Sequence, residues 1–497
     1  MSSTPAFLER RDAELLFGLV APIGVDRDRF VARLRDELLA FGYTSEVVKL
    51  SKLLKRVEPK EGEWKLVERP EAERLESYMT AGDQFRRGTG RNDALVLMAA
   101  GEIGRQRVGT ERALRRRATI LDSLKHADEV ITLRQIYDSG VFLVGLYAPE
   151  SERLRFLCEV QGLSGIDAER LMKRDEEEPL PHGQQARDVF QLSDVFVRVD
   201  REEQLERGLA RFLDLVFGSP TTTPTEDEHA MFLAYAVAMR SAALGRQVGA
   251  VIVSREGDVL AVGANDVPKF GGGQYWPGPD DQRDHRRGHD SNATQRDEIV
   301  NDVATRLLHA GVVSAESEAT RRAVESAIRD SRLGDVTEYG REVHAEMEAI
   351  LSCARSGGST RDATLYTTTF PCHNCAKHIA SAGIVRVVFV EPYPKSKAVE
   401  LHSDSLTLEE SERDRKVFLE PFVGVGPRRY MDVFSLRLGS GSPLDRKRGK
   451  VVVPWRREGA SPRVQLMPMS YLEKEEAAQR RVDDILVTRD SDSEDKT

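Results

Sequence analysis

The 497-residue sequence predicts an α/β protein with two domains. Strand-like and helix-like segments alternate between residues 15 and 217, as they do in proteins with a parallel sheet. A second set of such segments begins at residue 226, after Gly218-Ser219-Pro220 and a run of threonine and proline. Because a chain of this length exceeds one ordinary hydrophobic core, a domain on each side of that break is expected.

The predicted domain boundaries follow these changes in pattern. The first domain covers residues 1–218, a linker covers 219–225, and the second domain covers 226–472. Residues 266–341 are predicted to be a long insertion in the second domain. Residues 473–497 form a charged tail, and its end is expected to be disordered because large apolar side chains are scarce there.

The first domain opens with a strand at 15–21 and a helix at 27–41. Asp26 precedes this helix, and its side chain is expected to cap the first turn. The alternation then continues with strands at 43–50, 119–121, 141–147 and 195–199 and helices at 95–107, 126–137 and 203–217. This order predicts a nucleotide-binding type of parallel sheet.

The turn after the first strand matches a phosphate-binding loop only in part. The pattern G-x-x-x-x-G-K-[ST] needs a lysine that meets the β and γ phosphates of a nucleotide. Gly18, Gly24 and Asp26 are the candidate nucleotide-loop residues. Val25 stands where the lysine should be, and Gly18 is one position away from the required glycine. The first domain is therefore expected to lack kinase activity.

The run from Lys173 to Glu178 consists only of charged residues. Such runs usually lie on solvated surfaces, so an exposed helix end or lid is expected there.

The second domain alternates in a different order. Helices are predicted at 226–245, 343–354 and 374–382, and strands at 248–253, 259–264, 363–368, 385–390, 416–422 and 430–436.

Two short motifs in this domain carry the chemistry. They are His344-Ala345-Glu346 and Pro371-Cys372-His373-Asn374-Cys375. A set of one histidine and two cysteines suits Zn²⁺, and three protein ligands leave a fourth position open, as in catalytic zinc sites. Glu346 is expected to take a proton from water and pass it to a leaving group.

Two other kinds of Cys-x-x-Cys site were weighed. A redox pair would not need His344 and Glu346 upstream, and a structural zinc site would need a fourth ligand. Both ligand motifs are also expected at helix N-termini, where the helix dipole favours a thiolate and a carboxylate.

H-x-E followed by P-C-x-x-C is the signature of zinc-dependent deaminases, so the second domain resembles the cytidine-deaminase-like α/β/α fold. The run from Arg246 to Val253, followed by Gly263-Ala264-Asn265, resembles deoxycytidylate deaminases in particular. That resemblance implies that Asn265 holds the nucleoside sugar and that Arg246 approaches the phosphate. Glu348 departs from the family, which often has asparagine two residues after the glutamate.

Taken whole, the chain resembles bacterial antiphage dCTP/dCMP deaminases, in which a P-loop kinase-like parallel-sheet domain precedes a deoxycytidylate deaminase domain. The resemblance implies conversion of dCTP or dCMP to the uracil nucleotide and ammonia, which depletes dCTP during phage infection. It also implies a regulatory N-terminal domain and an inhibitory small RNA or nucleotide effector. The alternatives are a housekeeping dCMP deaminase and a deaminase acting on polynucleotide. The net charge of −9 and the three tryptophans disfavour the polynucleotide.

The composition predicts a cytoplasmic protein. The four cysteines imply no disulfide framework, since two of them are assigned to metal. Neither an apolar signal segment nor an apolar run long enough to span a membrane is expected. Assembly into a homo-oligomer is expected as well.

Overall fold

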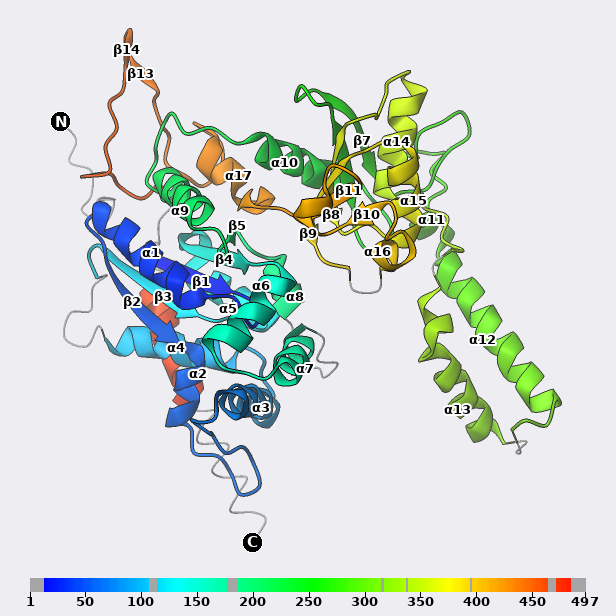
Figure 1. Cartoon of the computed structure of the whole chain (residues 1–497), viewed down its shortest axis with the longest axis horizontal. Helices are drawn as coiled ribbons and strands as arrows, with labels where there is room; N and C mark the ends of the chain where they lie inside the picture. The colour runs from blue at the N-terminus through cyan, green and yellow to red at the C-terminus, as the bar shows by residue number, and fades with distance from the viewer. Residues whose placement is uncertain are drawn as a thin grey trace. The chain divides into compact units, whose positions relative to one another are not determined.

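The computed structural model describes residues 13–106, 114–176, 186–313, 317–336, 338–393, 396–463 and 471–483 (Figure 1). The chain divides into two compact units. Unit 1 contains Met1–His229 and Phe422–Thr497, and unit 2 contains Ala230–Pro421. Among the described residues, no helix combines the length and the apolar character that crossing a membrane requires.

Unit 1 is built on a six-stranded sheet in the order β12-β5-β4-β1-β3-β2. The strands are β1 (Leu15–Val20), β2 (Thr44–Lys49), β3 (Arg117–Asp122), β4 (Val141–Tyr147), β5 (Val195–Arg198) and β12 (Gly424–Val425). The first five run parallel, and β12 pairs antiparallel with β5 at one edge. The predicted parallel-sheet domain is therefore confirmed, with β1 at its centre.

Helices cover both faces of this sheet. They are α1 (Arg27–Ala40), α2 (Leu50–Leu53), α3 (Glu71–Thr89), α4 (Ala94–Arg105), α5 (Ala127–Tyr137), α6 (Glu150–Arg155), α7 (Gly165–Glu176), α8 (Ala186–Phe190), α9 (Glu202–Val216) and α17 (Pro427–Phe434). Alternate residues of β1 enter two cores: Phe17 and Leu19 pack with α1 and α9, and Leu16 and Val20 pack with α4 and α5. A strand buried on both faces explains the apolar run read from the sequence.

The C-terminal segment corrects the predicted domain boundary. Residues 422–472 were assigned to the second domain, but β12 extends the sheet of unit 1, where Arg429 donates to the carbonyl oxygen of Val141. Residues 471–483 form a helix, and Tyr471 and Val482 lie in the core of unit 1. The predicted disorder at the end of the tail concerns residues outside the described ones.

A second correction concerns residues 430–436, which were predicted to be a strand. They lie largely in α17, because Gly426 and Pro427 start a helix there, and proline is well suited to a first helical position.

The nucleotide-loop prediction needs a correction at Gly18. This glycine lies in the middle of β1, where an added Cβ would come 2.9 Å from Leu124 Cδ1 and 3.2 Å from Leu143 Cδ1. It therefore serves packing in the sheet and is no part of the loop. Gly24 does lie in the turn, with a φ of 85°. Asp26 caps α1 as predicted, since its Oδ1 accepts from Arg29 N at 3.0 Å.

Unit 2 has its own six-stranded sheet, in the order β10-β11-β9-β8-β6-β7. The strands are β6 (Gly249–Val253), β7 (Val259–Ala264), β8 (Thr364–Thr369), β9 (Arg386–Glu391), β10 (Leu406–Thr407) and β11 (Val417–Pro421). Strands β8, β9, β11 and β10 lie next to one another in this order and run parallel, and β6 pairs antiparallel with β7 and β8. The helices of this unit are α11 (Asp284–Arg287), α12 (Ser291–His309), α13 (Glu318–Arg329), α14 (Ala345–Arg355), α15 (His373–Ser381) and α16 (Ala398–Leu401), while α10 (Glu226–Ala238) spans the division between the units.

The insertion contains a hairpin of two long helices. Helices α12 and α13 lie side by side and share a small apolar core of Val300, Ala304 and Ile328 (Figure 1). Buried ion pairs hold the root of the insertion: Arg283 donates to Asp281 at 2.9 and 2.8 Å and lies 3.4 Å from Asp266. Neither helix was predicted.

Candidate metal centre and active site

The N-termini of α14 and α15 bring the two sequence motifs together. His344 occupies the N-cap position of α14, and Cys372 occupies that of α15, where its Sγ accepts from Cys375 N at 3.4 Å. The predicted placement of both motifs at helix starts is thus what the structure has.

Close packing of α14 on β7 fixes the position of this centre. Gly263 of β7 faces the backbone of α14, and a Cβ added there would come 2.2 Å from Ala345 O and 2.4 Å from Ala349 N. Only a residue without a side chain allows this approach. Gly263 of the Gly263-Ala264-Asn265 motif therefore allows the close packing of α14, the helix that carries Glu346.

Gly263→Ala is expected to destabilise unit 2 by roughly 1–3 kcal/mol, the usual cost of overpacking, because α14 must move away from the sheet. Zinc content should fall with it. The control is Gly278→Ala in the same unit, where an added Cβ meets nothing within 4 Å. Urea unfolding and elemental analysis of both variants test this expectation, and equal midpoints would contradict it.

Three donor atoms meet between the helices. His344 Nδ1 lies 3.3 Å from Cys372 Sγ and 3.3 Å from Cys375 Sγ, and the three atoms all lie within 4.8 Å of one another. This is the one such group of three found among the described residues. An imidazole nitrogen and two sulfurs are ligands that Zn²⁺ accepts, so the residues present fit the predicted cofactor.

The sulfurs are electrostatically distinct. A hydrogen bond from Cys375, helped by the His344 ring, lowers the pKa of the Cys372 thiol to about 3. The same bond and burial raise the pKa of Cys375 well above its ordinary value. The bond to Cys372 raises the pKa of His344 to about 9. The lowered pKa of Cys372 favours its thiolate form, the form in which cysteine binds metals.

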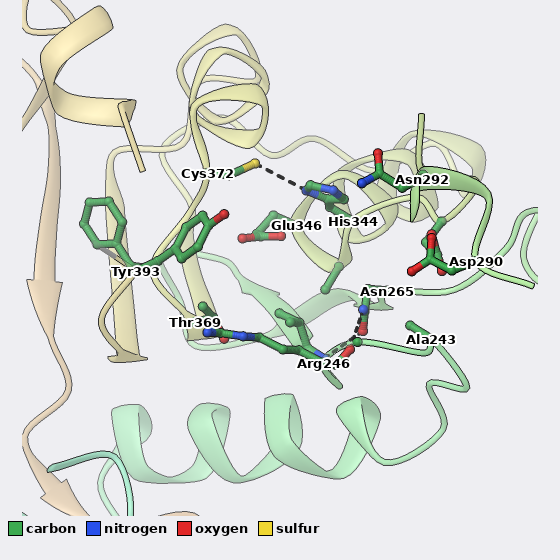
Figure 2. Close-up of a pocket in the computed structure, with 16 residues that line it drawn as sticks. Ala243, Arg246, Asn265, Asp290, Asn292, His344, Glu346, Thr369, Cys372 and Tyr393 are labelled. Atoms are coloured by element: carbon green, nitrogen blue, oxygen red, sulfur yellow. Dashed lines mark hydrogen bonds between the residues drawn. The ribbon is translucent and has the colours of Figure 1, made fainter. Parts of the chain in front are cut away.

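Glu346 reaches the same place from the first turn of α14. Its side chain is buried, and its Oε2 lies 3.4 Å from Cys375 Sγ. Burial raises its pKa above the ordinary value for a carboxyl. Figure 2 shows the carboxylate directed into a pocket beside His344 and Cys372.

The pocket has a volume of about 300 Å³, at the small end of the range for small-molecule sites. Arg246 and Asn265, which the family resemblance implies to be substrate-binding residues, both line it (Figure 2). Asn265 Oδ1 accepts from Val248 N at 2.7 Å, and its Nδ2 donates to Arg246 O at 2.7 Å. The amide oxygen of Asn265 can accept one more hydrogen bond, and its amide nitrogen can donate one more, to a ligand.

Arg246 lies at the exposed side of the pocket. It forms an ion pair with Glu391 and lies over the ring of Tyr393, 5.8 Å from the ring centroid. These contacts fix the orientation of the guanidinium and leave more than half of the Arg246 side chain exposed.

Several pocket residues were not foreseen. Asp290 and Asn292 come from the start of α12, and Glu342, Thr369 and Tyr393 complete the wall. Thr369 and Glu342 stand within three residues of a metal ligand, so proximity to the motifs could have found them. Nothing in the sequence links the start of α12 to the site.

Glu348, the departure from the family pattern, does not line the pocket. It is buried, and its Oε1 accepts from Arg355 Nη2 at 2.6 Å, about two helical turns further along α14.

Comparisons with known proteins agree with this centre. Residues 224–391 match the family model described as the cytidine and deoxycytidylate deaminase zinc-binding region. The deoxycytidylate deaminase of Enterobacteria phage T2 is 52% identical over 56 residues, which are 11% of this chain and 30% of that protein. Mouse deoxycytidylate deaminase is 26% identical over 163 residues, 33% of this chain and 63% of that protein. The chain thus matches less than two thirds of each relative.

Solved structures give weaker likenesses. A gluconokinase from Sinorhizobium meliloti 1021 aligns with a TM-score of 0.23 and 14% identity, over 41% of this chain and 95% of that one. At such a score, the likeness says nothing about chemistry. The family match and the cluster of donor atoms agree where they overlap: residues 224–391 contain a zinc-binding region of the cytidine and deoxycytidylate deaminase kind, whose metal-binding cluster is His344, Cys372 and Cys375.

Proposed function

We propose that unit 2 removes the amino group of cytosine deoxynucleotides by hydrolysis, which releases ammonia and the uracil nucleotide. The observation that carries the proposal is one pocket lined by His344 and Cys372 of the metal-binding cluster, by a buried carboxylate and, at its exposed side, by an arginine. The names of the phage and mouse relatives support the same substrate class.

The proposed mechanism assigns the proton transfers to Glu346. A zinc ion held by His344, Cys372 and Cys375 would supply Lewis acidity that lowers the pKa of water. Glu346 then accepts the proton of the water that adds to C4 of cytosine and delivers it to N3. Glu346 then takes the proton of the new hydroxyl on C4 and passes it to the amino nitrogen, so that the bond from C4 to nitrogen breaks, ammonia leaves and C4 becomes a carbonyl. Burial of this carboxylate keeps bulk water from competing for these transfers.

We propose that Asn265 binds the deoxyribose and that Arg246 binds the 5′-phosphate. Arg246→Gln is expected to raise KM for dCMP by about 10- to 100-fold, since a hydrogen bond to a charged group is worth about 1.5–3 kcal/mol. The KM for deoxycytidine, which has no phosphate, should rise much less. Steady-state kinetics on both substrates test this, and an equal change in KM for the two would contradict the phosphate role.

A deamination assay across CMP, dCMP, dCTP, cytidine and single-stranded DNA tests the substrate class. A kcat/KM for dCMP or dCTP well above that for the other three is expected. Faster turnover of single-stranded DNA would replace the proposal with a deaminase acting on polynucleotide.

The biological part of the proposal rests on the two-part resemblance to antiphage deaminases. We propose that the enzyme drains dCTP during phage infection and that unit 1 restrains it until then, with a small RNA or a nucleotide as effector. Such coupling needs only about 1–3 kcal/mol to change activity by roughly 5- to 150-fold. A cytoplasmic homo-oligomer is part of the same proposal, and the four free cysteines fit a reducing compartment.

Cells carrying the chain or its Glu346→Gln variant should differ in dCTP after infection but not before it. An equal dCTP level in both, with phage and without, would refute the antiphage role and leave the deaminase reaction untouched.

A further inference from the structure

Unit 1 contains a crevice of about 130 Å³ at the carboxyl ends of β1 and β3. Ligands of parallel sheets bind outside this edge. Four cations line the crevice, together with two carboxylates and an apolar wall from α2 and α3. The cations are Arg27, Arg74, Arg86 and Lys125, and the carboxylates are Glu129 and Asp175.

One of the two carboxylates is already committed to the backbone. Glu129 Oε2 accepts from Lys125 N at 2.7 Å and from His126 N at 3.0 Å, where it closes the cap of α5. Asp175 is the carboxylate that pairs with Lys125 in the crevice.

Two hydrogen-bond donors from different loops meet at the Asp175 carboxylate. Its Oδ2 accepts from Ile23 N at 2.7 Å, in the turn between β1 and α1, and its Oδ1 accepts from Lys125 Nζ at 2.7 Å. Lys125 Nζ also donates to Ala21 O at 2.9 Å. Asp175 is 1% exposed, so the prediction that this charged run is solvated is wrong at this residue.

A lysine and a backbone N–H from the turn after the first strand are the donors that hold a phosphate in nucleotide-binding loops. Here Lys125 comes from the loop after β3, while Val25 occupies the usual place of the lysine. The partners that hold three of the other cations, Asp122, Glu71 and Asp83, do not line the crevice. The surface that faces the crevice thus has more positive than negative groups.

We propose that this crevice is a second ligand site, for the phosphate of a small phosphomonoester with a ring or apolar group, and that the Asp175 carboxylate occupies the phosphate position when no ligand is bound. Ile23 N–H and Lys125 hold either anion. Leu75, Tyr78 and Met79 offer the apolar contact for the organic part of the ligand.

The position of Asp175 allows the exchange. It lies in the last turn of α7, whereas Ala168, Leu171 and Met172 anchor the rest of that helix in an apolar cluster with Met79. Arg174 in the same turn donates to Thr80 Oγ1 at 3.0 Å and to Asp83 Oδ2 at 2.9 Å. The carboxylate can therefore leave when this turn loosens and these two bonds break, without unpacking the rest of the helix.

The test is isothermal titration of the full-length, zinc-loaded protein with inorganic phosphate and with AMP, in phosphate-free buffer. Asp175→Asn is expected to bind AMP at least about tenfold more tightly than wild type, because the internal anion is gone. Adding Lys125→Met should remove that gain. Glu169→Gln, on the exposed side of α7, makes the same change of charge and should match wild type.

Hydrogen exchange on wild type keeps the test independent of how well Asp175→Asn folds. Saturating AMP should speed exchange in the last turn of α7 while the amide of Ile23 stays protected. Equal AMP affinity in Asp175→Asn and Glu169→Gln, or unchanged exchange at α7 in wild type, overturns the site. An affinity for AMP no higher than for phosphate overturns the role of the apolar wall.

Discussion

Glu346→Gln is expected to lower kcat for deamination by roughly 10²- to 10⁴-fold, the usual contribution of a general acid-base group. Glutamine keeps the size and the hydrogen-bonding shape of the side chain but cannot carry the proton between water, N3 and ammonia. Because Glu346 is not one of the three donors of the metal-binding cluster, zinc should remain bound. Stopped assays and elemental analysis of the same sample separate the two effects.

The control is Glu256→Gln, which makes the same chemical change on the exposed turn between β6 and β7. It should keep both zinc and turnover. Near-normal turnover in a zinc-loaded Glu346→Gln protein would refute the assigned proton path. Loss of zinc together with activity would show instead that the carboxylate supports the metal centre.

The centre of unit 2 was predictable because its chemistry lies in short, local motifs. His344 and Glu346 are separated by one residue, and Cys372 and Cys375 by two, so each motif places its own side chains at one helix start. Arg246 and Asn265 were reached through resemblance, and the pocket contains both. Their roles with a substrate remain predictions.

Longer-range features were not predictable in the same way. The two-residue strand β12 is too short to show a pattern, and its pairing with β5 depends on a partner more than two hundred residues earlier. Helices α12 and α13 bury few side chains and pack on each other, so their sequences contain few large apolar residues that would place them against a main core. Asp175 lies in a run of charges that suggests solvent, and only the tertiary fold places Lys125 and Ile23 N–H beside it.

Removal of a sulfur ligand should have the largest effect on the cofactor. Cys375 is buried, and its Sγ lies 3.3 Å from His344 Nδ1 and 3.4 Å from Glu346 Oε2. Cys375→Ser replaces a soft sulfur with a hydroxyl that stays protonated at neutral pH, and zinc binds the deprotonated ligand. Zinc per chain is expected to fall by roughly tenfold or more, which corresponds to at least about 1.4 kcal/mol of binding. Deamination should fall with it.

Cys353→Ser is the matched control for this loss. Cys353 is equally buried, in α14, but its sulfur is outside the metal-binding cluster. Both variants bury a hydroxyl in place of a thiol, so both should lose some stability, while only Cys375→Ser should lose zinc. Elemental analysis after dialysis against a weak chelator measures the difference. Equal zinc loss in the two variants would mean that general destabilisation of α14 and α15 releases the metal, and Cys375 would then lose its place as a ligand.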